Sequence, residues 1–244
     1  MNSIPTENPA VLLHRSLTLF RSQPRRTSNR DAWAIVFKVH PSETGLLIVG
    51  LAKLIGRSDQ VQSLLAFSTP SALTTRWVGP VSESLAHSAE LSQQATLAQK
   101  LLDESCMLSL EACAAAIGRG DCAEPSADQI QLALQLTDEL LMAISQSGMP
   151  FEAYSLMMRH MLALQQALKL LPVVGMDGLY DAMLAAVQAL EQPAVRSQLR
   201  TPWHQKLRSA LATIAQTLTL GNTVIDEASK VIHALPPGSN PFSG

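Results

Sequence analysis

Residues 91–117 decide the fold class, and they read LSQQATLAQKLLDESCMLSLEACAAAI. Apolar side chains recur in this stretch at spacings of three or four residues, which places them on one face of an α-helix. The positions that share this spacing are Leu91, Ala95, Ala98, Leu102, Cys106, Leu110, Cys113 and Ile117. The pattern predicts one continuous helix from about Ser82 to Ile117, ended by Gly118 and Gly120.

The sequence that follows predicts more helices, each with its own start and stop signals. Ser126 and Gln129 form a capping box, so we expect a helix from this point to Gly148. The next helix should follow Pro150, and because it is apolar on most sides we expect it to lie centrally. Pro172 should end that helix, and further helices are expected over 177–190, 201–221 and 222–235.

The chain before residue 91 is also predicted to be helical. We call the apolar positions from Leu91 to Ile117 the apolar stripe. Residues 45–55 suit a buried strand as well as a helix, but their length and the following Gly56 favour a helix. Ser58 can cap a continuation through Phe67. Pro70, Gly79 and Pro80 then predict a loop-rich passage around Trp77.

Composition agrees with a helical fold of ordinary size. Hydrophobic residues make up 47% of the 244 residues, whereas aromatic residues make up only 4%. The apolar content is mostly Leu, Ala, Ile, Val and Met, and Leu, Ala and Met are good helix formers. We therefore predict an all-α fold, a single multi-helix bundle of about seven helices over residues 40–235. A basic N-terminal arm should precede it at 1–39, and a disordered tail should follow at 236–244.

Charge is distributed unevenly along the chain. Residues 1–38 hold six basic side chains against Glu7 and Asp31, whereas residues 101–158 hold nine acidic side chains against Arg119. Both regions are expected to contact partners. The candidate contacts to a partner or to nucleic acid are Arg21, Arg25, Arg26 and Arg30. An arginine-bearing, acid-poor start is also typical of a targeting or secretion segment.

The cysteines favour packing over chemistry. Cys106 and Cys113 are seven residues apart on the predicted helix, which separates them by roughly 10 Å and prevents them from sharing a zinc ion. Both lie on the apolar stripe, so we expect them in the core. Cys122 follows the glycines and is the one cysteine expected to be accessible. Three cysteines do not form a disulfide framework, which favours a cytoplasmic protein without a metal site.

No stretch predicts a stable membrane insertion. His14 and Arg15 interrupt the apolar run near the N-terminus, so it lacks the pattern of a signal peptide. The longest apolar stretch, residues 45–55, contains Lys53 and is shorter than the roughly 20 residues that span a bilayer.

Catalytic patterns are sparse. The six histidines form no pair with zinc-binding helical spacing, and no phosphate-binding or nucleophile-elbow sequence is present. His160 is a candidate base because Asp177 or Asp181 could orient it, although a buried or boundary histidine that is hydrogen-bonded to the backbone is the simpler explanation. Three acidic pairs are expected on solvated helix surfaces: Asp103–Glu104, Asp138–Glu139 and Asp226–Glu227.

These observations favour a non-catalytic helical protein that interacts through its surface, such as an adaptor, chaperone, regulator or effector subunit. Its partner would be another protein or itself, and we assign it no catalytic, cofactor-binding or metal-binding residue. One alternative is an enzyme with an all-helical pocket that uses His160 and Asp181. Another is a protein that binds nucleic acid through the arginine-rich arm.

Overall fold

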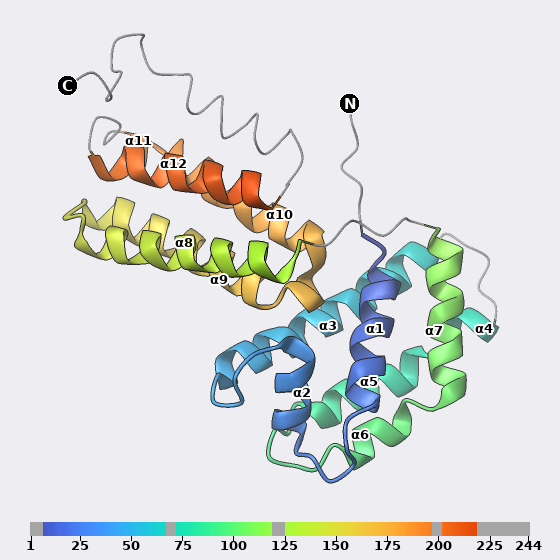
Figure 1. The fold of residues 1–244 in the computed structure, drawn as a ribbon. Coiled ribbons are helices and arrows are strands. Elements are labelled where there is room, and N and C mark those ends of the chain that lie inside the picture. The colour runs from blue at the N-terminus through green and yellow to red at the C-terminus, as the bar shows by residue number, and fades with distance from the viewer. Residues whose placement is uncertain (1–6, 67–71, 119–124, 197–201, 219–244) are drawn as a thin grey trace. The chain divides into compact units, whose positions relative to one another are not determined.

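The computed structural model describes residues 7–66, 72–118, 125–196 and 202–218, and throughout these ranges the fold is all-α (Figure 1). The described residues contain no strand, and their one β-bridge joins Ser28 to Gln94. In the described part of the chain nine helices have seven residues or more; two of them, Pro9–Arg21 and Asn29–Phe37, precede residue 40, and the other seven agree with the number expected for the bundle. The chain divides into two compact units, whereas the sequence pattern had suggested a single bundle over 40–235.

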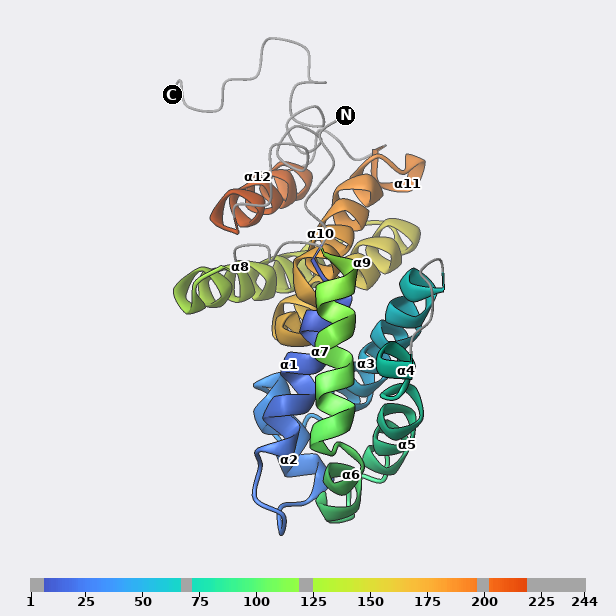
Figure 2. The same ribbon diagram turned by 90° about the vertical axis from the view of Figure 1, so that its right-hand side faces the viewer.

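Unit 1 comprises residues 1–123 and 169–177. Its helices are α1 (Pro9–Arg21), α2 (Asn29–Phe37), α3 (Thr44–Leu65), α4 (Ala72–Thr75), α5 (Val78–Ser88), α6 (Thr96–Leu101) and α7 (Glu104–Ile117). Helix α1 packs against α3 and α7, and Figure 2 shows α7 beside α1. The basic N-terminal residues are therefore part of a packed unit, which differs from the arm expected at 1–39.

Helix α1 is fixed in unit 1 by its cap and by its apolar face. The side chain of Asn8 accepts hydrogen bonds from the backbone of Ala10 and Val11, and its Nδ2 donates to the Ala114 carbonyl of α7 at 2.8 Å. Leu13 and Leu17 are fully buried beneath the helix. A capped helix with one continuous buried face has no reason to detach as an arm.

Aromatic side chains form the centre of unit 1. The ring of Trp33 stacks on Phe20 with a centroid distance of 4.2 Å, and on Phe37 at 5.1 Å. All three side chains are fully buried. Phe37 also fills the space where Gly50 of α3 lacks a side chain, since a Cβ there would lie 2.5 Å from the ring. Three of the ten aromatic residues of the chain thus meet where α1 and α2 contact α3.

The predicted continuous helix at 82–117 is wrong, although the apolar stripe within it is correct. Three helices (α5, α6 and α7) replace it, with a turn before α6 and an N-cap at Asp103, whose side chain accepts from the Cys106 backbone. The stripe residues from Leu91 to Cys113 are nevertheless buried. Burial follows the apolar spacing, while Asp103 bonds locally to the backbone and begins a new helix.

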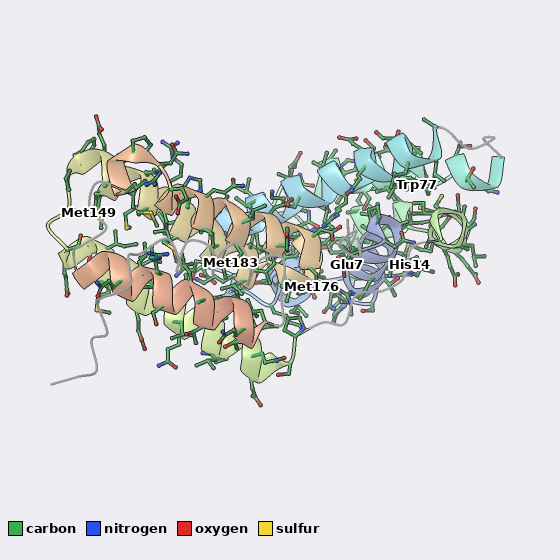
Figure 3. The ribbon with its side chains drawn as sticks, turned by 90° about the horizontal axis from the view of Figure 1, so that it is seen from above. Glu7, His14, Trp77, Met149, Met176 and Met183 are labelled. Carbon is green, nitrogen blue, oxygen red and sulfur yellow. The ribbon has the colours of Figure 1, made fainter. Side chains whose placement is uncertain are left out.

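Segment 169–177 belongs to unit 1 and is held there by polar contacts. Lys169 pairs with Glu43 at 3.0 Å, and Arg57 donates to the Val174 carbonyl. Asp177 was expected to cap its own helix, but its carboxylate accepts the Glu7 backbone N–H at 3.2 Å. The buried Glu7 carboxylate accepts the Met176 N–H at 2.6 Å, and Figure 3 shows these two residues together.

Unit 2 comprises residues 124–168 and 178–244. Its helices are α8 (Ala127–Gln146), most of α9 (Phe151–Lys169), the larger part of α10 (Leu171–Leu190), α11 (Pro193–Arg196) and α12 (Pro202–Thr217). The Ser126–Gln129 capping box is confirmed at the start of α8. Helix α12 packs against α8. The core is aliphatic and methionine-rich, with Leu140, Met157 and Met161 among its buried side chains.

Some expectations fall outside the described residues. They are the disordered tail at 236–244, the helix beginning at Asn222, the carboxylate pair Asp226–Glu227, and Cys122.

Candidate functional site

The four candidate arginines lie on the link between α1 and α2 or at its borders. Arg21, Arg25, Arg26 and Arg30 are all exposed. In the described part of the chain, none of their side chains forms a hydrogen bond or an ion pair. Their guanidinium groups are therefore available to an anionic partner.

The backbone that carries these arginines is fixed to the turn before α6. Arg30 donates to the Leu91 carbonyl at 3.0 Å, and Thr27 accepts from the Ala95 N–H at 2.9 Å. The Gln99 side chain donates to Phe20 and Gln23 carbonyls, each at 3.0 Å. The arginines are consequently presented by an ordered surface of unit 1 and not by a free arm.

Acidic side chains are present on the elements that carry this basic cluster and on elements in contact with them. Asp31, Glu90, Asp103 and Glu104 are exposed on the same connected elements. They reduce the positive potential that four arginines alone would create.

His160 and Asp181 both lie in unit 2, on α9 and α10. His160 is half-buried, whereas Asp181 is exposed. Burial lowers the pKa of His160, and the positive charge of Arg159 lowers it further. Among the described residues neither side chain forms a hydrogen bond or an ion pair, so nothing in this arrangement orients the imidazole as a base.

Cys106 and Cys113 are buried thiols in unit 1. Burial raises the pKa of Cys106 to about 11, and burial also raises that of Cys113. The Cys113 thiol donates to the Thr74 carbonyl at 3.3 Å. Neither cysteine is a thiolate at neutral pH, so both have the properties of packing residues.

The described acidic and histidine side chains do not form a metal site. Within residues 7–66, 72–118, 125–196 and 202–218, no three His, Cys, Asp or Glu side chains gather closely enough to hold a metal ion. Asp103 caps α7, and Asp138 accepts from Gln165. These two carboxylates therefore have local structural partners.

One surface in unit 2 was not predicted from the sequence, and it lies along α9. Phe151 is 80% exposed and Leu162 is 42% exposed, while Tyr154 and Met158 between them are half-buried. Their spacings of three, four and four residues align all four on one stripe of the helix. Helix α9 is thus not surrounded by protein on all sides, so the expected central position of this helix is wrong.

Helix α8 continues the same surface. The Gln165 side chain donates to the Asp138 carboxylate, which places the apolar stripe on the side of α9 that faces α8. Met142, one turn beyond Asp138, is 59% exposed, and Leu141 is half-buried. We call Leu141, Met142, Phe151, Tyr154, Met158 and Leu162 the α8–α9 face.

Methionines are concentrated around this face. Five of the nine methionines in the chain lie between residues 142 and 161. Met157 and Met161 are buried, whereas Met142 is exposed and Met149 and Met158 are half-buried. Met149 occupies the turn that joins the two helices (Figure 3). Methionine side chains adapt their shape readily, which suits a surface that binds other proteins.

Arg208 of α12 is an unusual group within unit 2. It is 6% exposed, and its Nε and Nη2 atoms have no hydrogen-bond partner in the described ranges. Burial lowers the pKa of this guanidinium, against an opposing effect of Glu191. Because a buried, incompletely bonded cation is costly, we expect Arg208 to reduce the stability of unit 2.

Helix α10 has the length and the apolar composition of a membrane-spanning segment. Among the described helices it alone is long and apolar enough to cross a bilayer by length and composition. Half of its apolar window is buried, and Gly175 interrupts the helix with φ of 64° and ψ of −176°. Core helices meet the same criteria, so α10 gives only weak support for membrane insertion.

Comparison with other proteins does not supply a family. The chain matches no protein-family model, no curated protein and no solved structure.

Proposed function

We propose that this chain is a non-catalytic interaction protein that binds a protein partner through the α8–α9 face. The observation that supports the proposal most directly is Phe151, a phenylalanine that is 80% exposed in a chain with few aromatic residues. Clustered exposed apolar side chains are a feature of binding surfaces. The adaptor, chaperone, regulator and effector roles all remain compatible with such a surface.

The test is affinity purification of the full chain from its native cell, with mass spectrometry of the proteins that co-elute. The double variant Met142→Ser, Phe151→Ser should lose the partner. A matched double variant in unit 1, Ile35→Ser with Leu108→Ser, removes apolar side chains of 56% and 54% exposure and should retain it. No partner and no self-association for the unaltered chain would contradict the proposal.

A second candidate function is binding of a nucleic acid through Arg21, Arg25, Arg26 and Arg30. Their exposed, unpaired guanidinium groups on a fixed backbone favour it. The acidic side chains on the same elements weaken it, because they oppose the attraction of phosphates. Binding of a labelled oligonucleotide should fall steeply with salt and be lost when all four arginines are replaced by Gln; binding that persists in the quadruple variant would exclude this site.

The enzyme alternative receives no comparable support. His160 has a lowered pKa but no hydrogen bond to Asp181, and Asp181 is exposed. Replacing His160 by Ala should therefore leave binding of the partner unchanged.

A further inference from the structure

We infer that the partner segment bound by the α8–α9 face is a cationic amphipathic helix of another protein. This inference rests on the proposed function and adds the chemistry of the partner. Three properties of the face lead to it: the length of its apolar stripe, its adaptable side chains and the charge around it.

The apolar stripe has the dimensions of a helix-binding surface. From Phe151 to Leu162 it extends over eleven residues of α9, or about 16 Å along the helix axis. Leu141 and Met142 of α8 widen it on the side where Gln165 contacts Asp138. A partner helix with apolar residues at i, i+3 or i+4, and i+7 would match this length.

The composition of the face favours a helix over a deeply inserted side chain or an extended strand. Met142 and Met158 are unbranched, so they can adjust to ridges of different shape on a partner helix. Phe151 is a rigid anchor at one end, next to the turn that carries Met149. In the described residues, unit 2 presents helices only, and it offers no strand edge for pairing.

The charged side chains of α8 and α9 indicate the sign of the partner's charge. Within four residues of the face along α8 and α9, three exposed carboxylates (Asp138, Glu139, Glu152) stand against one exposed cation, Arg159. Asp138 lies directly beside the apolar stripe, where it accepts from Gln165. A cationic helix would be attracted to this surface, whereas the same face of a second copy would be repelled.

The experiment uses the full chain and two synthetic helical peptides of about 18 residues. Both peptides carry leucine at identical positions with i, i+3, i+4, i+7 spacing; one has lysine on its polar face and the other has glutamate. Fluorescence anisotropy measures their affinities at low and high salt. The lysine peptide should bind at least about tenfold more tightly than the glutamate peptide, and its affinity should fall with salt.

Variants locate the binding to the face. Met142→Ser with Phe151→Ser should weaken the lysine peptide about tenfold or more, whereas Ile35→Ser with Leu108→Ser should leave it unchanged. Asp138→Asn with Glu152→Gln should weaken it severalfold, and the matched pair Glu83→Gln with Glu111→Gln in unit 1 should not. Circular dichroism of each variant establishes that it is folded.

Each result bears on the inference. Equal affinity for the two peptides, or equal loss in the unit 1 control variants, would overturn it. Sedimentation that shows a dimer broken by Met142→Ser and Phe151→Ser would assign the face to a second copy instead. If a cellular partner requires the α8–α9 face but the lysine peptide does not bind, the proposed function stands and the cationic helix is wrong; if neither binds, both fail.

Discussion

The two units of this chain use their aromatic side chains in opposite ways. Unit 1 buries Phe20, Trp33 and Phe37 in one stack, while unit 2 leaves Phe151 mostly exposed. Unit 1 also buries polar side chains that form hydrogen bonds, such as Asn8 and Ser84, although Asn29 Oδ1, Trp33 Nε1 and Gln99 Oε1 are buried without a partner among the described residues. In unit 2 the buried group without a full set of partners in the described ranges is a cation, Arg208, whose Nε and Nη2 are unbonded.

This difference indicates a division of roles. A unit whose aromatic side chains stack in its own core needs no partner to complete its packing. A unit that exposes aromatic and methionine side chains keeps apolar surface available, which lowers its own stability and favours a partner. We therefore expect the core substitutions in unit 1 to be the more destabilising ones.

The largest effect is expected from Trp33→Ala in unit 1. Loss of the ring leaves a cavity between Phe20 and Phe37, and we expect about 3–5 kcal/mol of destabilisation in urea unfolding. Ile35→Ala on the same helix, at an exposed position, should cost less than about 1 kcal/mol. Equal losses in the two variants would show that the aromatic stack does not organise unit 1.

A smaller but still large effect is expected from Gly175→Ala, also in unit 1. Its φ of 64° with ψ of −176° is essentially restricted to glycine, and an added Cβ would lie 2.1 Å from the Glu7 carboxylate oxygen. We expect a loss of about 2 kcal/mol or more in thermal unfolding. Gly56→Ala in α3, where a Cβ meets nothing within 4 Å, should be neutral or stabilising. A stable Gly175→Ala variant would show that segment 169–177 is not held by Glu7.

Arg208→Met in unit 2 is expected to increase the free energy of unfolding, whereas the two preceding substitutions decrease it. Replacing a buried cation that lacks bonds at Nε and Nη2 should raise stability by about 1 kcal/mol, measured by urea unfolding. Arg196→Met changes an exposed arginine of the same unit and serves as the control, with little effect expected. Destabilisation by Arg208→Met would mean that the guanidinium has a compensating partner. Unit 2 would then not be destabilised by this buried cation.

The smallest effect concerns the pH dependence of unit 2. The pKa of His160 is lower in the folded chain than the ordinary value of 6.5, so the unfolded chain binds a proton more readily. The folded state is therefore favoured when the imidazole is neutral, above pH 6.5. This contribution to stability is lost as the pH falls through 6.5 and below. His160→Gln should remove this part of the acid sensitivity. In NMR titration of the imidazole, Arg159→Gln should raise the pKa of His160 only partly, since burial is the larger cause. A pKa above 6.5 in the unaltered chain would contradict this account.

Much of the fold was predictable because apolar spacing and capping chemistry act locally. The stripe from Leu91 to Cys113 is buried as expected, and the Ser126–Gln129 box begins α8. The sequence pattern does not show the breaks within 82–117, because the apolar spacing continues across them. An aspartate such as Asp103 occurs both on exposed helix surfaces and at N-caps. Asp177 was assigned to its own helix, but the distant Glu7 backbone takes its carboxylate. A local sequence pattern does not predict a hydrogen bond between residues that are 170 positions apart.

The candidate site was harder to predict than the fold. The i, i+3, i+7, i+11 spacing of Phe151, Tyr154, Met158 and Leu162 was visible in the sequence. It was read as part of a helix buried on most sides, because core and binding surface have the same apolar composition. Only the exposure of Phe151 and Leu162 distinguishes the two.

The sequence by itself determined that this protein is helical and that the apolar stripe from Leu91 to Cys113, with two of its cysteines, is buried. These properties depend on periodicity and side-chain chemistry, which are local. The tertiary structure decided that the basic N-terminal residues join a packed unit, that the chain forms two units, and that one apolar stripe remains exposed. Burial of an apolar face depends on which distant helix reaches it, and a sequence pattern does not contain that information.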